Sequence, residues 1–258
     1  MVLNKIVAFL VFFCFIISCN TNNENTSSGA DCEKIQAQLL ETLRKKRDTI
    51  HSKQFYSVWE LSFIKQGLVD IQNIDTTIHI DLRYSSTNNF LGKDVYGDVK
   101  RAYLQPDVAG KLSNAQQFLK QIHPEYSLLV FDAVRPLAIQ QMMWDTIKML
   151  GADKLKYLTN PKYGSIHNYG AAVDISIIDS AGAELDMGTP FDFFDELAQP
   201  SMEITMKNRG KLSDLHLKNR QLLRSVMSRA GFFNIETEWW HFNYCTREKA
   251  SVLYKIIP

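Results

Sequence analysis

The 258-residue sequence has few cysteines, no excess of either charge, and no apolar run as long as the roughly 20 residues that a membrane-spanning helix needs. Its four cysteines include no CxxC pair, which argues against a cysteine-based zinc site. Lysine and arginine total 29 against 28 aspartates and glutamates, so no basic surplus indicates a nucleic-acid partner. Hydrophobic residues make up 45% and charged residues 22%, as in soluble globular proteins.

The longest apolar run lies at the N-terminus. Lys5 is followed by uninterrupted apolar residues from Ile6 to Ile17 and then by Ser18-Cys19. A basic start, a short apolar core and small residues are typical of a secretory signal, and the residues around Cys19 resemble a bacterial lipobox. We therefore expect a signal peptide over 1–18 and a lipid on Cys19. An ordinary cleaved signal and a retained membrane helix are the alternatives.

This reading predicts an exported lipoprotein, anchored on the periplasmic side or in the outer membrane. Residues 19–55 would form its linker, with an Asn/Thr/Ser-rich start and a short helix from Cys32 to about Arg47. The compact domain would cover 56–258. Cys32 and Cys245 could pair in an oxidising compartment, and the sequence leaves this open.

The hydrophobic pattern over 56–258 predicts an α+β fold, in which helices cover a small antiparallel or mixed sheet. Strands are expected at 78–82, 127–134, 171–178 and 236–244. Helices are expected at 106–122, from Pro136 to about 150, and at 212–230, the last closed by Gly231.

Two segments supply the residues for metal chemistry. The first is SIHNYGAAVD, with His167 and Asp174, and the second is EWWH, with Glu238 and His241. Two imidazoles and a carboxylate are good zinc ligands that leave a fourth position for water. Glu238 could accept a proton from that water, which completes the residue set of a metallopeptidase.

The expected strands restrict how these residues can meet. Asp174 shares a strand face with Ala172 and Ser176, away from the apolar face. Glu238 and His241 are three residues apart and would point to opposite faces of a regular strand. Both can reach one metal ion only if the strand begins after Glu238 or contains a bulge there.

Taken together, the spacing of the two segments resembles the D-alanyl-D-alanine dipeptidase family, which includes the vancomycin-resistance dipeptidase and belongs to the zinc D,D-peptidase group. Four further blocks agree with it. They are DLRY at 81–84, NF and YG between 89 and 97, DAVRP at 132–136 and MGTPFD at 187–192. The resemblance covers about residues 70–245 and implies the zinc D,D-peptidase fold.

The resemblance also implies roles for individual residues. His167, Asp174 and His241 would bind one Zn²⁺ ion, and Glu238 would be the general base. Arg135 would stabilise the oxyanion, the alternative being a structural salt bridge. The remaining two positions are implied to bind substrate: Asp192, which could instead cap a helix, and Ser165, which could instead form a turn. The family commonly has Gly-Tyr where this chain has Ala-Val at 133–134, which leaves its fine specificity open.

The implied function is hydrolysis of the small dipeptide D-Ala-D-Ala, with the membrane contacted through the lipid anchor and no protein partner implied. Because an exported enzyme does not meet cytosolic precursors, we expect it to scavenge dipeptide from the cell wall. A D,D-carboxypeptidase or endopeptidase acting on peptidoglycan stems is the alternative. A non-enzymatic zinc-binding module and a purely structural lipoprotein would leave the catalytic residues or the paired motifs unexplained.

Overall fold

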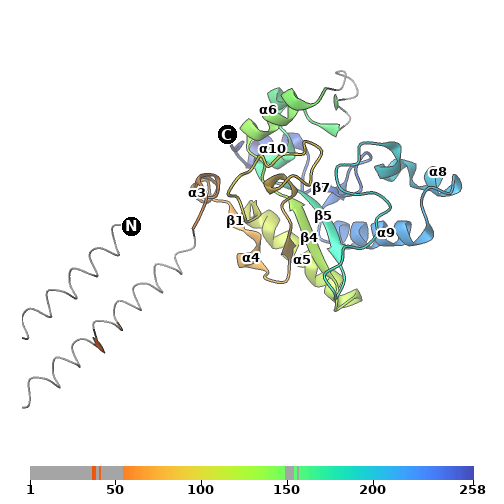
Figure 1. The fold of residues 1–258 in the computed structure, drawn as a ribbon, viewed down its shortest axis with the longest axis horizontal. Coiled ribbons are helices and arrows are strands. Elements are labelled where there is room, and N and C mark those ends of the chain that lie inside the picture. The colour runs from red at the N-terminus through yellow and green to blue at the C-terminus, as the bar shows by residue number, and fades with distance from the viewer. Residues whose placement is uncertain (1–36, 39–40, 42–54, 149–153, 156) are drawn as a thin grey trace, which may run out of the picture. The chain divides into compact units, whose positions relative to one another are not determined.

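Five short strands form the sheet at the centre of the computed structural model, which describes residues 37–38, 41, 55–148, 154–155 and 157–258 (Figure 1). The strand order is β2-β4-β5-β7-β6, with β2 parallel to β4 and every other neighbouring pair antiparallel. These strands are β2 (His79–Ile80), β4 (Ser127–Asp132), β5 (Ala172–Ile178), β6 (Phe233–Asn234) and β7 (His241–Asn243). A separate pair joins β1 (Val69–Asp70) to β3 (Tyr103–Leu104).

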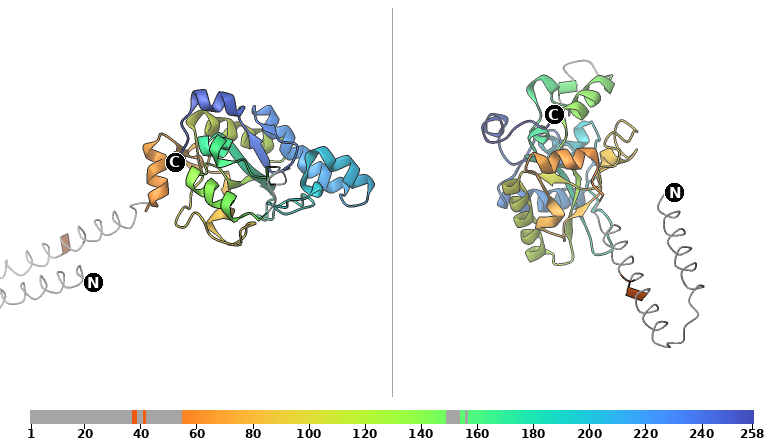
Figure 2. Two further views of the ribbon diagram at one scale, coloured as in Figure 1. Left: turned by 90° about the horizontal axis from the view of Figure 1, so that it is seen from above. Right: turned by 90° about the vertical axis from the view of Figure 1, so that its left-hand side faces the viewer.

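Two long helices pack together against this sheet. α5 (Pro106–Ile122) contacts α9 (Asp214–Arg229) and β4, and α9 contacts β6. α6 (Leu137–Thr146) lies apart from α5 in all three views (Figures 1 and 2). Shorter helices complete the fold: α3 (Val58–Lys65), α4 (Ile71–Ile74), α8 (Glu203–Asn208) and α10 (Arg247–Leu253). A mixed sheet covered by helices confirms the predicted α+β class.

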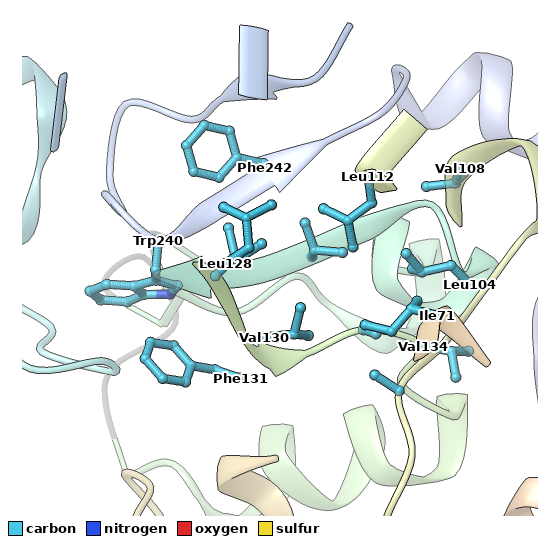
Figure 3. Close-up of a cluster of buried hydrophobic side chains, with 14 of the residues drawn as sticks. Ile71, Leu104, Val108, Leu112, Leu128, Val130, Phe131, Val134, Trp240 and Phe242 are labelled. Atoms are coloured by element: carbon cyan, nitrogen blue, oxygen red, sulfur yellow. The ribbon is translucent and has the colours of Figure 1, made fainter. Parts of the chain in front are cut away.

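One face of the sheet belongs to the hydrophobic core. Leu128 and Val130 of β4 lie opposite Ile177 and Ile175 of β5, and all four side chains are fully buried. Figure 3 shows Leu112 of α5 close to this face. Burying such a side chain contributes roughly 1.5–3 kcal/mol, so this contact holds the sheet firmly on its helix.

The other face carries polar groups. Asp174 lies opposite both Asp132 of β4 and His241 of β7, because the strands pair in that register. A shift in the β4 register between Val130 and Asp132 turns Asp132 toward this face. The prediction that the Asp174 side chain lies on the face of the strand away from the apolar residues is confirmed.

Most predicted elements are present, but two predicted strands are wrong over more than half their length, and the strand predicted at 78–82 is limited to His79–Ile80. The helix at 106–122 is confirmed at both ends, and Gly231 follows α9 with a φ of 97°. The strand predicted at 236–244 is limited to His241–Asn243. The preceding residues form a turn, because the Asn234 amide donates to the carbonyls of both Glu238 and His241.

The N-terminal predictions fall outside the described residues. These are the signal peptide at 1–18, the lipidated Cys19 and most of the helix from Cys32, of which the three described residues at 37, 38 and 41 are helical. Among the described residues, Cys245 is buried and has no disulfide partner, and Cys32, with which it could pair, lies outside them. Among the described residues, no helix has the length and apolar character to cross a membrane.

Candidate metal centre and active site

Three side chains from separate elements converge on the polar face of the sheet. Possible ligand atoms of His167, Asp174 and His241 all lie within 4.8 Å of one another. Asp174 Oδ1 is 2.9 Å from His241 Nδ1 and 3.3 Å from His167 Nε2, and the two imidazole nitrogens are 3.1 Å apart. The structure therefore brings the three predicted ligands together.

A glycine turn delivers His167 to this cluster. His167 lies in the 3₁₀ helix η3 (Ile166–Tyr169), which ends at Gly170 with a φ of 65°. A Cβ atom at Gly170 would also come within 2.9 Å of Leu68 Cδ2. Only glycine fits this left-handed turn easily, and the turn leads the chain directly into β5 and Asp174.

Each imidazole is oriented through its other nitrogen. His167 Nδ1 donates to the carbonyl oxygen of Ala133 at 2.6 Å, and His241 Nε2 donates to Asn243 Oδ1 at 2.9 Å. His167 Nε2 and His241 Nδ1 then face Asp174, and the lone pair of each is available to a metal ion once the ring is neutral and carries its proton on the other nitrogen. Two oriented imidazoles beside a carboxylate form a donor set that suits zinc.

Electrostatics supports a cation at this cluster. Although burial alone would raise the pKa of Asp174, the two neighbouring imidazoles hold it well below its usual value. Burial acts to lower the pKa of His241, but hydrogen bonding to Asp174 and its charge outweigh burial and raise it. Asp174 thus stays anionic and attracts positive charge to the centre of the cluster.

Glu238 lies beside the cluster without joining it. Its Oε2 is 4.0 Å from His241 Nδ1, and its side chain is buried. Burial and the charge of Asp174 raise the pKa of Glu238 to about 7, against the opposing effects of His241 and Arg135. β7 begins after Glu238, the first of the two arrangements that the sequence allowed. A carboxylate with this pKa can both accept and release a proton near neutral pH.

Arg135 follows β4 and lies in the same cavity. Its Nε and Nη2 donate to Asp132 Oδ2 at 2.9 and 2.7 Å, and Nη1 donates to Gln140 Oε1 at 3.0 Å. Nη2 also lies 3.4 Å from Asp174 Oδ2. The buried salt bridge considered for Arg135 is therefore present. It fixes the guanidinium in the wall of the cavity, where a cation with several donors can stabilise developing negative charge.

Asp192 lies in another part of the cavity wall and does not cap a helix. The next helix, η4 (Glu196–Ala198), is capped by Asp195. Asp192 accepts hydrogen bonds from the Tyr84 hydroxyl at 3.1 Å and the Phe90 amide at 3.3 Å. Burial and the charge of Asp174 raise its pKa well above the usual value, and its φ of 60° is uncommon for aspartate.

Ser165 has the structural role that was the alternative for it. Its hydroxyl accepts the His167 amide at 3.3 Å, and the Asn168 side chain completes a capping box at the start of η3. Ser165 also lines the cavity. Its side chain therefore supports the loop that presents His167, and it is also positioned to contact a small ligand.

The cavity has a volume of about 410 Å³ and contains every predicted site residue that the structure describes. This is near the lower end of the roughly 300–1,000 Å³ range of small-molecule pockets. Further lining residues were not predicted as site residues: Tyr84, Phe90, Gln140, Tyr157, Phe194 and Asn243. Alternation with His241 along a strand could have identified Asn243 from the sequence.

Comparisons with known proteins agree with this geometry. A family model described as D-ala-D-ala dipeptidase matches residues 64–254. A D-alanyl-D-alanine dipeptidase of Escherichia coli is 30% identical over 178 residues, which cover 68% of this chain and 83% of that protein. One of Enterococcus faecium is 28% identical over 191 residues, covering 68% of this chain and 90% of that protein. One of Synechocystis is 31% identical over 168 residues, covering 54% of this chain and 68% of that protein.

Proposed function

The chain belongs to the D-Ala-D-Ala dipeptidase family, and on that premise we propose that it hydrolyses D-alanyl-D-alanine to two D-alanines with one zinc ion. His167, Asp174 and His241 would hold the ion. The observation that carries the proposal is the placement of Glu238 beside these ligands, 4.0 Å from His241, in a cavity that also contains Arg135.

The residues divide the chemistry of peptide hydrolysis among them. A zinc ion held by these residues would supply an activated water and polarise the scissile carbonyl. Glu238 accepts the proton of the attacking water and later delivers it to the leaving amine. Arg135 donates to the oxyanion that forms when the carbonyl carbon becomes tetrahedral. Because Asp132 and Gln140 already hold the guanidinium in place, little reorganisation is needed when this charge develops.

A dipeptide has a free ammonium next to its scissile bond, and we assign its recognition to Asp192. The Tyr84 hydroxyl and the Phe90 amide orient this carboxylate. An N-blocked peptide would leave the carboxylate without a cationic partner, which costs on the order of several kcal/mol in a closed site. The assignment therefore supports a dipeptidase over a D,D-carboxypeptidase or endopeptidase.

Hydrolysis of two substrates by the purified full-length chain tests this function. We expect release of D-alanine from D-Ala-D-Ala and little release from an N-acetylated tripeptide ending in D-Ala-D-Ala. Loss of activity on adding a chelator, restored by zinc, would support the metal assignment. Preference for the blocked tripeptide would instead identify a D,D-carboxypeptidase.

We further propose that the enzyme is an exported lipoprotein that scavenges dipeptide released from the cell wall. The support is the signal-like sequence that ends at Cys19. Membrane association should be lost in Cys19→Ala, as measured by cell fractionation. Overproduction should not confer vancomycin resistance in a host whose outer barrier admits the drug. Cytosolic wild-type protein or clear resistance would contradict this proposal.

A further inference from the structure

One of the two histidine ligands is oriented by a side chain. Asn243 Oδ1 lies 2.9 Å from His241 Nε2, and Asn243 lines the cavity while being largely buried. We propose that Asn243 is a positioning residue, which selects the tautomer of His241 that binds the metal ion. This inference rests on the proposed metal centre.

The hydrogen bond works through the two nitrogens of one ring. An amide oxygen can only accept, so His241 must carry its proton on Nε2 to bond with Asn243 Oδ1. The neutral ring then has its lone pair on Nδ1, which is the nitrogen that lies 2.9 Å from Asp174 Oδ1. Without Asn243, the ring can carry its proton on either nitrogen and can rotate, so fewer molecules present Nδ1 to the metal ion.

The sheet fixes the position of Asn243. Asn243 and His241 are two residues apart on β7 and share its polar face, while Phe242 between them is fully buried on the other. The backbone of Asn243 pairs with Ala172 on one side and Phe233 on the other. With strands on both sides, the amide is held beside the ring that it orients.

The other histidine ligand shows why this side chain matters. His167 Nδ1 donates to the backbone carbonyl of Ala133, which is present whatever residue occupies that position. His241 depends instead on the chemical nature of residue 243. The partners that orient metal-bound histidines commonly affect metal affinity about 10- to 100-fold.

Zinc affinity of the full-length chain, measured with a competing chelator, tests this inference. Asn243→Leu removes the acceptor at similar size, and we expect zinc to bind about 10- to 100-fold more weakly. Asn243→Asp keeps the acceptor and should bind zinc at least as tightly as the wild type. Asn219→Leu is the matched control, because Asn219 is also buried and hydrogen-bonded, to the Asp186 carbonyl, outside the cavity.

An affinity of Asn243→Leu within about threefold of wild type would overturn the inference, since the usual effect of such partners is at least about tenfold. So would an equal loss in Asn219→Leu, which would indicate general destabilisation. If Asn243→Leu does not fold, Asn243→Ala replaces it in the same measurement.

A second measurement separates this inference from the metal assignment. Nitrogen-15 NMR of the metal-free protein at alkaline pH, where the ring is neutral, compares the tautomers of His241 in the wild type and in Asn243→Leu. Because the ring then keeps Asp174 as an acceptor but loses Asn243, Asn243→Leu should carry a larger share of the proton on Nδ1 than the wild type. If the wild type binds no zinc, the proposed metal centre fails, and the NMR result alone decides the role of Asn243. The same tautomer distribution in wild type and Asn243→Leu would refute it.

Discussion

Replacing Glu238 by glutamine should abolish most of the turnover while leaving the metal in place. Glu238→Gln keeps the size of the side chain but removes its ability to accept a proton. General acid–base groups contribute about 10²–10⁴ in rate, so kcat should fall by about that factor, equivalent to roughly 3–5 kcal/mol in the barrier. The ligand atoms of His167, Asp174 and His241 are mutually close without Glu238, so zinc content should not change.

The role of Glu238 as a base also predicts how activity changes with pH. Glu238 must be ionised to accept a proton, and burial raises its pKa to about 7 in the metal-free site. Activity should therefore fall as the pH drops and Glu238 becomes protonated. A bound dication favours the carboxylate, so this acidic limb should lie below 7 in the zinc enzyme. Glu238→Gln should lack it in its residual activity.

The assay combines kcat against pH on D-Ala-D-Ala with zinc content measured on the same samples. Glu238→Asp is the matched control, because it keeps the carboxylate and shortens its reach by one methylene. We expect it to retain zinc and to be more active than Glu238→Gln. Zinc loss in Glu238→Gln would identify Glu238 as a ligand, and near-normal turnover would exclude it as the base.

Three further predictions concern the remaining site residues. His241→Ala should lose zinc, measured by metal analysis, and equal zinc in variant and wild type would contradict the ligand assignment. Arg135→Ala should lower kcat much more than it raises KM, because the oxyanion exists only in the transition state; an effect on KM alone would mean that Arg135 binds substrate. Asp192→Asn should reduce kcat/KM for the free dipeptide much more than for an N-acetylated analogue, and an equal effect on both would remove its role in binding the ammonium.

The sequence was most informative for residues whose type and spacing together fit few kinds of site. His167, Asp174, Glu238 and His241 were identifiable because few other functions require that residue set in that arrangement. The sequence also defined the condition for Glu238 and His241 to meet, a strand beginning after Glu238, which the structure satisfies.

Contacts between distant segments were not predictable in this way. Tyr84 and Phe90 reach Asp192 across more than 100 residues of sequence, and no local pattern encodes that approach. Gln140 is only five residues from Arg135, but its hydrogen bond to Arg135 depends on how α6 follows β4, which the hydrophobic pattern of the predicted helix does not describe. Such residues acquire their roles from tertiary packing, which periodicity does not describe.

The charged side chains that line the cavity bear on metal binding, substrate binding and specificity together. Besides the exposed Glu236, three carboxylates line it, those of Asp174, Asp192 and Glu238. The charge of Arg135 beside them is already paired with Asp132, and burial together with the charge of Asp174 raises the pKa of both Asp192 and Glu238 in the metal-free site. A zinc ion would compensate the charges of Asp174 and Glu238, and the substrate ammonium would pair with that of Asp192. A blocked peptide lacks the ammonium and leaves Asp192 without a cationic partner, so this local pairing favours a free dipeptide over a blocked one.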